Sequence, residues 1–191
     1  MQRFCDILAE KGGNLMRLKE ISFEELKLNP MTLIGREWML VTAGNQERGY
    51  NTMTAAWGHM GAIWEMSGRK SPLPTALCFV RPQRYTKEFM DREETYTLTF
   101  FDESWRKQLG YLGTVSGRDE NKIEKAGLTP VFSDGTTWFA EAKLVLVCRK
   151  LYQQELREDC FVDQTVMDRN YPKRDFHTMY IGEIIKVLAR E

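Results

Sequence analysis

The run "KLVLVCRKLY" (Lys143–Tyr152) has the length and the composition of a β-strand, and its apolar residues fall on both faces. Such a strand must be covered on both sides, so we expect it to lie inside a layered β structure. A second run, "TYTLTFF" (Thr95–Phe101), alternates between apolar and polar residues and also predicts a strand. These two runs favour a mainly β chain.

Further strands and several short helices complete the predicted elements. Strands are predicted at Arg36–Gly44, from Tyr50, at Thr75–Val80 and at Met179–Arg190. Helices are predicted at Phe23–Pro30, ended by Asn-Pro; at Lys87–Glu94, capped by Thr86; at Glu103–Leu112; and between an Asp119 cap and Gly127. The helices do not alternate strictly with the strands, which argues against a doubly wound parallel sheet. A closed or partly closed antiparallel β-barrel fits better.

Composition excludes several classes of protein. The formal net charge is zero, from 27 basic and 27 acidic residues, so the chain as a whole is not predicted to bind nucleic acid. No apolar run approaches the ~20 residues that span a membrane. The N-terminus lacks the layout of a secretory signal, and the four cysteines form no Cys-x-x-Cys pair. We therefore expect a cytoplasmic protein with reduced cysteines.

The segment "YNTMTAAWGHMG" (Tyr50–Gly61) begins like a strand and then loses its bulk. Two alanines precede Trp57, and glycines follow it. Either the chain turns a tight barrel corner here, or a flat ligand lies close against the main chain. The segment alone leaves both interpretations open.

Two polar segments are candidates for anion binding. "RPQRYT" (Arg81–Thr86) places two arginines and a threonine before a predicted helix, where free N–H groups and a guanidinium suit a phosphate. "SGRDENK" (Ser116–Lys122) offers a hydroxyl, an unhindered N–H at Gly117 and a lysine. The alternatives are a solvated turn with a capping threonine and a plain capped helix.

A third segment, "DFHTMYIGEI", contains His177 just before the last strand. This histidine is a candidate to bind a ligand or to transfer a proton near neutral pH, the alternative being a structural role. Neither His59 nor His177 has companions at metal-ligand spacing, so no metal site is predicted. The sequence also lacks a Walker loop, a Rossmann fingerprint and a Gly-x-Ser-x-Gly elbow.

Taken in order, five segments resemble the flavin reductase-like family, and most of all its flavoredoxin branch. They are "YNTMTAAW", "FVRPQRYTKEFM", "TLTFFDESWRKQL", "GTVSGRDENKIEKAGLTPVF" and "HTMYIGEI". The resemblance implies a six-stranded antiparallel Greek-key split β-barrel with short peripheral helices. It also implies a homodimer that holds FMN non-covalently near the subunit interface. The domain would cover residues 16–191, leaving residues 1–15 as an N-terminal extension and Met16 as a candidate start.

The resemblance also assigns the residues that would hold FMN. The flavin ring would lie against the segment formed by Asn51, Thr52, Met53, Thr54 and Ala55, largely through backbone groups. The phosphate would be held by Arg81, Arg84, Tyr85 and Thr86. Further contacts would come from Thr99–Phe101, Phe100 included, and from Ser116, Gly117 and Lys122.

One departure from the family concerns the electron donor. Many relatives that use NADH or NADPH have Gly-Asp-His where this chain has Asp175-Phe176-His177. Phe176 would fill the space of a nicotinamide, which argues against direct use of NADH or NADPH more than against FMN binding.

The expected function is an oxidoreductase that passes electrons from NADH, NADPH or a redox partner protein through FMN to an acceptor. His177 is the candidate catalytic residue. Lys122 and His177 are candidates to stabilise the reduced, anionic flavin. The alternatives are a flavoredoxin-type electron carrier that does not itself oxidise NADH or NADPH, and a split barrel that binds another ligand or stores flavin.

Overall fold

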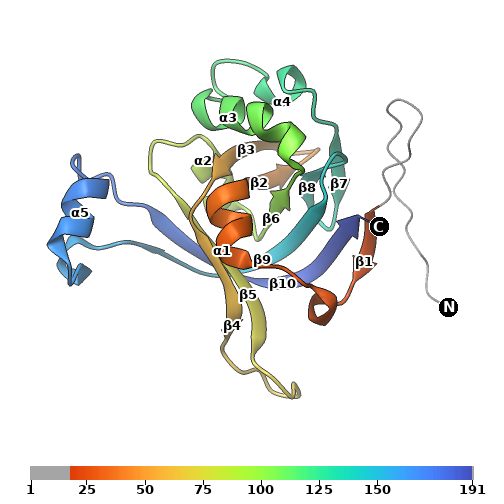
Figure 1. The fold of residues 1–191 in the computed structure, drawn as a ribbon, viewed down its shortest axis with the longest axis horizontal. Coiled ribbons are helices and arrows are strands. Elements are labelled where there is room, and N and C mark those ends of the chain that lie inside the picture. The colour runs from red at the N-terminus through yellow and green to blue at the C-terminus, as the bar shows by residue number, and fades with distance from the viewer. Residues whose placement is uncertain (1–17, 191) are drawn as a thin grey trace.

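A curved antiparallel β-sheet forms the centre of the computed structural model, which describes residues 18–190 (Figure 1). The expected extension at residues 1–15 and the candidate start at Met16 lie outside the described residues. The ten strands of the described part are β1 (Leu18–Ile21), β2 (Met39–Asn45), β3 (Gly49–Ala55), β4 (Gly58–Ile63), β5 (Leu73–Val80), β6 (Thr95–Phe100), β7 (Pro130–Ser133), β8 (Thr136–Phe139), β9 (Leu144–Glu155) and β10 (Thr178–Arg190).

The main sheet has the strand order β3-β2-β6-β9-β10-β5-β4, with β1 paired to β10. Strands β3 and β4 are the two ends of this order, yet only Ala56 and Trp57 separate them in the chain. The sheet must therefore curl until its ends approach each other, and β3 does lie against β5. The segment Tyr50–Gly61 is thus the corner at which the chain passes from one end of the sheet to the other.

The predicted fold class, an antiparallel β-barrel with short helices, is confirmed, but the strand count differs. All six predicted strands are present, and four more (β1, β4, β7, β8) accompany them. Strands β7 and β8 pair only with each other in a separate hairpin. The additional strands have only four to six residues, and none shows a clear alternation of exposed and buried positions except β4, so their own pattern gives a weak signal.

Two hydrophobic cores explain the composition of Lys143–Tyr152. Leu146 and Cys148 of β9 point into the barrel, where they join the core that contains Leu98 and Tyr180. The alternate residues of β9, Val145 and Val147, belong to a second core on the outer face of the sheet, together with Trp138 of β8. The prediction that this strand is covered on both sides is therefore confirmed.

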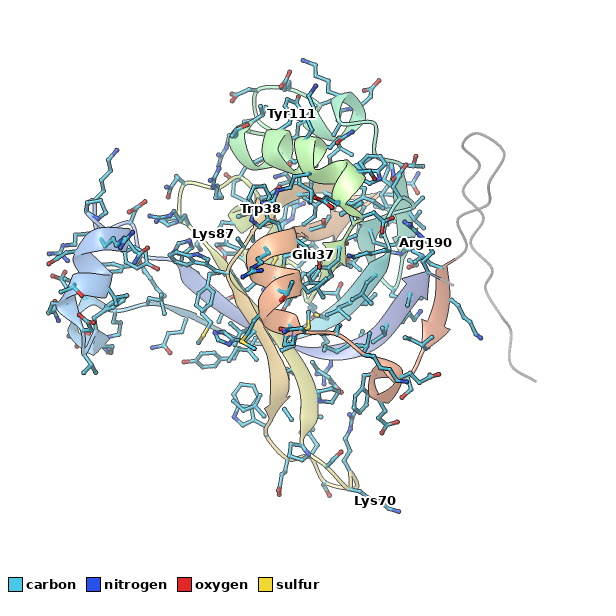
Figure 2. All side chains as sticks on the ribbon, in the orientation of Figure 1. Glu37, Trp38, Lys70, Lys87, Tyr111 and Arg190 are labelled. Carbon is cyan, nitrogen blue, oxygen red and sulfur yellow. The ribbon has the colours of Figure 1, made fainter. Side chains whose placement is uncertain are left out.

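Short helical segments connect the strands around the barrel. They are η1 (Phe23–Glu25), α1 (Pro30–Thr32), the π-helical η2 (Leu33–Glu37), α2 (Thr86–Arg92), η3 (Glu103–Trp105), α3 (Arg106–Thr114), α4 (Lys122–Lys125), η4 (Glu158–Cys160) and α5 (Gln164–Asn170). Helix α5 and the β4–β5 hairpin extend away from the barrel (Figure 1). Tyr111 on α3 and Lys70 at the tip of the hairpin lie at opposite ends of the molecule (Figure 2). No helix within residues 18–190 is long and apolar enough to cross a membrane.

Two predicted helix ends, at Asn29 and at Asp119, are wrong, and the helix predicted at Phe23–Pro30 is only the three-residue η1. Asn29 does not end a helix; its Oδ1 accepts hydrogen bonds from the backbone N–H groups of Met31 and Thr32 and so begins α1. Pro30 fits at the first helical position because it has no N–H to satisfy. The cap of α4 is Asn121, whose Oδ1 accepts from the N–H of Glu124, and not Asp119.

Candidate functional site

A buried hydrogen bond joins two of the predicted binding segments. Asn51 of β3 donates from Nδ2 to Oγ1 of Thr86 at 2.8 Å, and these residues are only 4% and 1% exposed. Thr86 is the first residue of α2 and does not cap it, contrary to the prediction, because its hydroxyl is turned toward β3. The start of α2 is thereby held against the middle of β3.

Gly117 brings the third segment to the same place. A Cβ atom at this position would lie 2.2 Å from Asn51 Oδ1 and 3.3 Å from Cδ1 of the Tyr85 ring. The first distance is too short for any Cβ atom and the second is tight, so the loop after α3 approaches β3 this closely because residue 117 is glycine. We call the place where β3, the start of α2 and the loop 116–122 meet the three-segment junction.

A pocket of about 470 Å³ opens at the three-segment junction. Its wall includes Tyr50 and Asn51 from β3, Tyr85 before α2, and Gly117 and Lys122 from the loop. Tyr85 is fixed by an edge-to-face contact with Phe89 (centroids 5.0 Å apart) and by the Arg118 guanidinium 4.5 Å above its ring. The pocket therefore combines an aromatic wall with amide and amine groups, as many ligand sites do.

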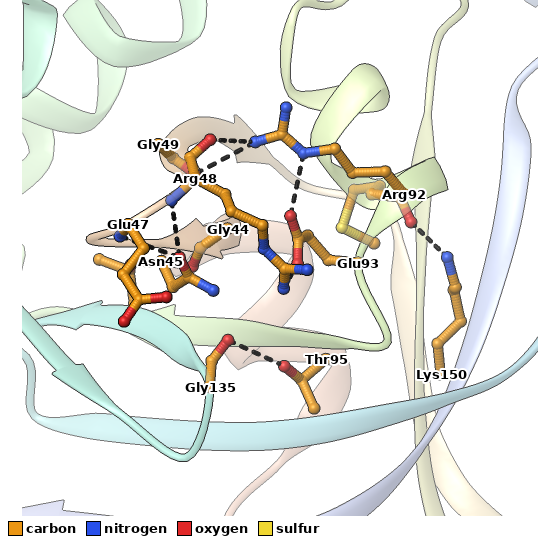
Figure 3. A network of polar contacts seen from close by, with 12 residues as sticks. Gly44, Asn45, Glu47, Arg48, Gly49, Arg92, Glu93, Thr95, Gly135 and Lys150 are labelled. Atoms are coloured by element: carbon orange, nitrogen blue, oxygen red, sulfur yellow. Dashed lines mark hydrogen bonds and ion pairs between the residues drawn. The ribbon is translucent and has the colours of Figure 1, made fainter.

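A polar network anchors the β2–β3 turn beside this pocket (Figure 3). Glu93 is 3% exposed and is held by Arg48 at 2.5 Å and by Arg92 at 2.9 Å. Arg92 also donates to the carbonyl of Gly49 at 3.2 Å. Because Arg48, Gly49 and Arg92 line the pocket, these ion pairs of two exposed arginines with the buried Glu93 carboxylate fix one of its walls.

Lys122 and Arg84 meet at the C-terminal end of α3. Lys122 is 4% exposed and donates from Nζ to the carbonyls of Leu112 (3.0 Å) and Val115 (2.9 Å). Arg84 donates to the carbonyl of Gly113 at 2.9 Å. The helix dipole favours cations here. Burial, and secondarily the charge of Arg84, lower the pKa of Lys122 to about 8.

The other predicted ring-contact residues have structural partners of their own. Thr52 bonds to Thr42 at 2.8 Å, and Thr54 donates to the carbonyl of Leu109 at 2.6 Å, which fixes α3 on β3. Met53, Ala55 and Phe100 are buried in the barrel core.

The hydroxyls of Thr99 and Ser116 differ in their surroundings. Thr99 Oγ1 is buried without a hydrogen-bond partner among the described residues. Ser116 Oγ accepts from the N–H of Arg118 at 3.2 Å and so shapes the turn before α4.

Arg81 and His177 form a second cluster, distinct from the three-segment junction. Arg81 donates to Asp175 Oδ2 at 2.6 Å and to the carbonyl of Asn170 at 2.9 Å. Its guanidinium is thus engaged by residues near α5, whereas Arg84, three positions later, reaches α3.

His177 is 8% exposed, and its Nδ1 lies 2.8 Å from the hydroxyl of Tyr171. The ring of Trp57 lies 4.8 Å from the imidazole, centroid to centroid. Burial, followed by the charge of Arg81, lowers the pKa of His177 to about 4. At this pKa the imidazole is neutral at pH 7, so the structure favours a hydrogen-bonding role for His177 over proton transfer near neutral pH.

Sequence reasoning missed Tyr171 and the helix before it. Phe176, 8% exposed, packs with Tyr171 (centroids 4.9 Å apart) and Met167 in a small third core. Phe161 borders this core. The aromatic residues at 161, 171 and 176 could have indicated a small core, but the charged residues between them break the apolar pattern. Among residues 18–190 no group of three or more His, Cys, Asp or Glu side chains is placed to hold a metal ion.

A curled antiparallel sheet with helices over its ends and a polar pocket at one end defines a split-barrel domain. The chain matches the family described as "Flavin reductase like domain" over residues 31–191, and it belongs to that family. No curated protein matches the chain.

Solved structures show the same fold at low sequence identity. An FMN-binding domain of a flavin reductases-like enzyme from Shewanella baltica OS155 aligns with a TM-score of 0.61 at 14% identity, covering 91% of this chain and 78% of that one. Flavoredoxin of Desulfovibrio vulgaris (Miyazaki F) aligns with a TM-score of 0.58 at 22% identity, covering 78% of this chain and 67% of that one. An NADH:FAD oxidoreductase from Streptomyces globisporus C-1027 aligns with a TM-score of 0.57 at 18% identity, covering 81% of this chain and 77% of that one.

Proposed function

We propose that the protein binds FMN at the three-segment junction and acts as a flavin-dependent oxidoreductase. The observation that carries this proposal is the convergence of Asn51, Tyr85 and Gly117, which come from three distant segments, at one pocket of about 470 Å³. The family assignment and relatives that bind FMN support it.

The cations beside the junction fit an anionic ligand. Lys122 and Arg84 bond to carbonyl oxygens, and within residues 18–190 neither is paired with a carboxylate. Their mutual repulsion contributes to the lowered pKa of Lys122. A phosphate would relieve this repulsion and accept charge-assisted hydrogen bonds. We therefore assign the phosphate contact to Arg84 and Lys122, since Arg81 is engaged by Asp175.

The planar ring would lie along β3, against the Tyr85 side of the pocket. When bound, flavin supplies the chemistry of hydride and single-electron transfer. The chain positions the flavin. Gly117 lets the loop 116–122 lie close to β3, and the Asn51–Thr86 hydrogen bond fixes the wall of the pocket. His177, neutral at pH 7, would serve as a hydrogen-bonding group toward the electron donor and not as an acid.

The second candidate is an electron carrier that receives electrons from a redox partner protein and not from NADH or NADPH. The specific observation in its favour is that flavoredoxin of Desulfovibrio vulgaris shares the fold. The two candidates predict the same cofactor and differ only in the electron donor.

A homodimer and a cytoplasmic location complete the proposal. Large apolar side chains are exposed near the β4–β5 hairpin and the adjoining strands, and the surfaces of monomers seldom carry such groups together. They are Ile63, Trp64, Met66, Tyr152 and Ile185. Light scattering after gel filtration should give twice the 22.3 kDa chain mass.

Anaerobic spectroscopy of the purified protein tests the function. The protein is loaded with FMN, separated from free flavin and mixed with NADH or NADPH. Loss of the flavin band within seconds supports the reductase; loss only with dithionite or an added reductase supports the carrier. A protein that retains no FMN after gel filtration would contradict both.

A further inference from the structure

Residues 156–177 form an excursion between β9 and β10 that contains η4 and α5 and extends from the barrel (Figure 1). Its two ends are joined by a hydrogen bond from the N–H of Leu156 to the carbonyl of His177 at 2.9 Å. Its interior is the third core, with Met167, Tyr171 and Phe176 buried. His177 therefore lies at the base of the excursion, where its conformation depends on how the excursion is held.

Arg81, at the end of β5, holds this excursion in place. It bonds to Asp175 and Asn170, and its guanidinium lies 5.2 Å from the centroid of the Tyr171 ring. Phe176 packs against Tyr171, with ring centroids 4.9 Å apart. These contacts fix the phenol ring, so its hydroxyl has a defined position beside His177.

The direction of the Tyr171–His177 hydrogen bond follows from the surrounding groups. The hydroxyl oxygen lies 2.8 Å from Nδ1 of His177. A phenol can donate its proton to a bare Nδ1 or accept from an Nδ1–H. A neutral imidazole nitrogen is a stronger acceptor than a phenol oxygen, and the nearby carbonyl of His177 already accepts from the N–H of Leu156 at 2.9 Å. We therefore expect the phenol proton to point to Nδ1, which acts as the acceptor.

We propose that Tyr171 is a positioning residue that holds His177 as the neutral tautomer with its proton on Nε2. On the side of the ring away from Tyr171, His177 then presents an N–H donor instead of a base. The effect on catalysis rests on the proposed function, because this N–H group would donate a hydrogen bond to the molecule that reduces the flavin. A carbonyl or amide oxygen is the chemical group that such a donor binds.

The charges around the imidazole agree with a neutral ring. Arg81 and Arg84 oppose protonation of His177, Asp175 favours it, and burial opposes it most. Asp175 is itself bonded to Arg81, which reduces its effect on the imidazole.

Nitrogen NMR of histidine-labelled protein tests the tautomer directly. The chain has only two histidines, so a His59→Gln variant assigns both sets of signals. We expect Nδ1 of His177 to be unprotonated and Nε2 to carry the proton at pH 7. A wild-type spectrum with the proton on Nδ1 would overturn the proposal.

Tyr171→Phe removes the hydroxyl and keeps the ring contacts with Phe176 and Arg81. We expect a mixture of the two tautomers and a higher pKa of His177, because the lost hydrogen bond stabilised the neutral ring. Tyr152→Phe, which removes an exposed hydroxyl bonded to Gln154, is the matched control and should leave the His177 signals unchanged. An unchanged tautomer in a natively folded Tyr171→Phe protein would also overturn the proposal.

Kinetics separate this proposal from the proposed function. With FMN-loaded protein, Tyr171→Phe should bind FMN as the wild type does and be reduced by NADH or NADPH about 3- to 10-fold more slowly, the effect of one neutral hydrogen bond. Equal rates would contradict the catalytic part. If the wild type itself is not reduced, the reductase function fails, while the NMR result still decides the role of Tyr171.

Discussion

Replacing Gly117 by alanine should disrupt the three-segment junction. The added Cβ would lie 2.2 Å from Oδ1 and 3.1 Å from Cγ of Asn51. Asn51 is 4% exposed and bonded to Thr86, so its side chain cannot move without breaking that bond. Overpacking costs about 1–3 kcal/mol and the lost hydrogen bond about 0.5–1.5 kcal/mol. We expect the free energy of unfolding to fall by about 2–4 kcal/mol and FMN affinity to fall with it.

Urea denaturation followed by circular dichroism measures the stability, and flavin fluorescence measures FMN binding. Gly110→Ala is the matched control, because a Cβ there meets nothing within 4 Å and the residue lies within α3. That change should stabilise the protein by about 0.5–1 kcal/mol, since alanine favours a helix over glycine. If Gly117→Ala matches Gly110→Ala in both stability and FMN affinity, the close approach at the junction is not what holds the site together.

Three further predictions test other parts of the molecule. Arg84→Ala should weaken FMN binding by about 1.5–3 kcal/mol and riboflavin binding much less, because only FMN carries the phosphate; equal losses in titrations would contradict the phosphate role. Because the pKa of Lys122 is lowered to about 8 in the folded protein, the folded protein loses this proton above pH 8 while the unfolded chain still holds it. The free energy of unfolding should therefore rise from pH 8 to 10, with a contribution from Lys122 on the order of 1.4 kcal/mol per pH unit. Urea titrations of the wild type and of Lys122→Met isolate this contribution, and parallel pH profiles of the two proteins would refute the prediction. Gly182→Ala would place a Cβ 2.6 Å from the Tyr96 hydroxyl and should lower stability by about 1–3 kcal/mol, whereas Gly61→Ala, in open space, should not; equal melting curves would exclude the clash.

Sequence patterns were sufficient for the long strands, whereas the residues of the junction were indicated by the family resemblance. Lys143–Tyr152 had to be buried on both faces, and two separate cores do cover it. Period and burial are local properties, so a strand of this length shows them in the chain itself. The short strands β4, β7 and β8 have four to six residues each, too few to show a period clearly, and they form through pairing with β5 or with each other.

The roles of neighbouring polar residues could not be predicted in the same way. Arg81 and Arg84 are three positions apart, yet one bonds to Asp175, 94 residues away, and the other to Gly113, 29 residues away. Two arginines in one turn have the same local pattern, and only distant partners distinguish them. The same holds for His177, whose neutral state depends on its burial and on Arg81.

The sequence by itself thus determined the β class and the long strands, because periodicity is a local property of the chain. That the segments around Asn51, Thr86 and Gly117 belong to one site was implied only by the family resemblance. Only the tertiary structure decided which arginine faces the junction, that Phe176 packs beneath α5, and that Tyr171 lies against His177. The physical reason is that hydrogen-bond direction and desolvation depend on groups brought together by folding, and these groups are far apart along the chain.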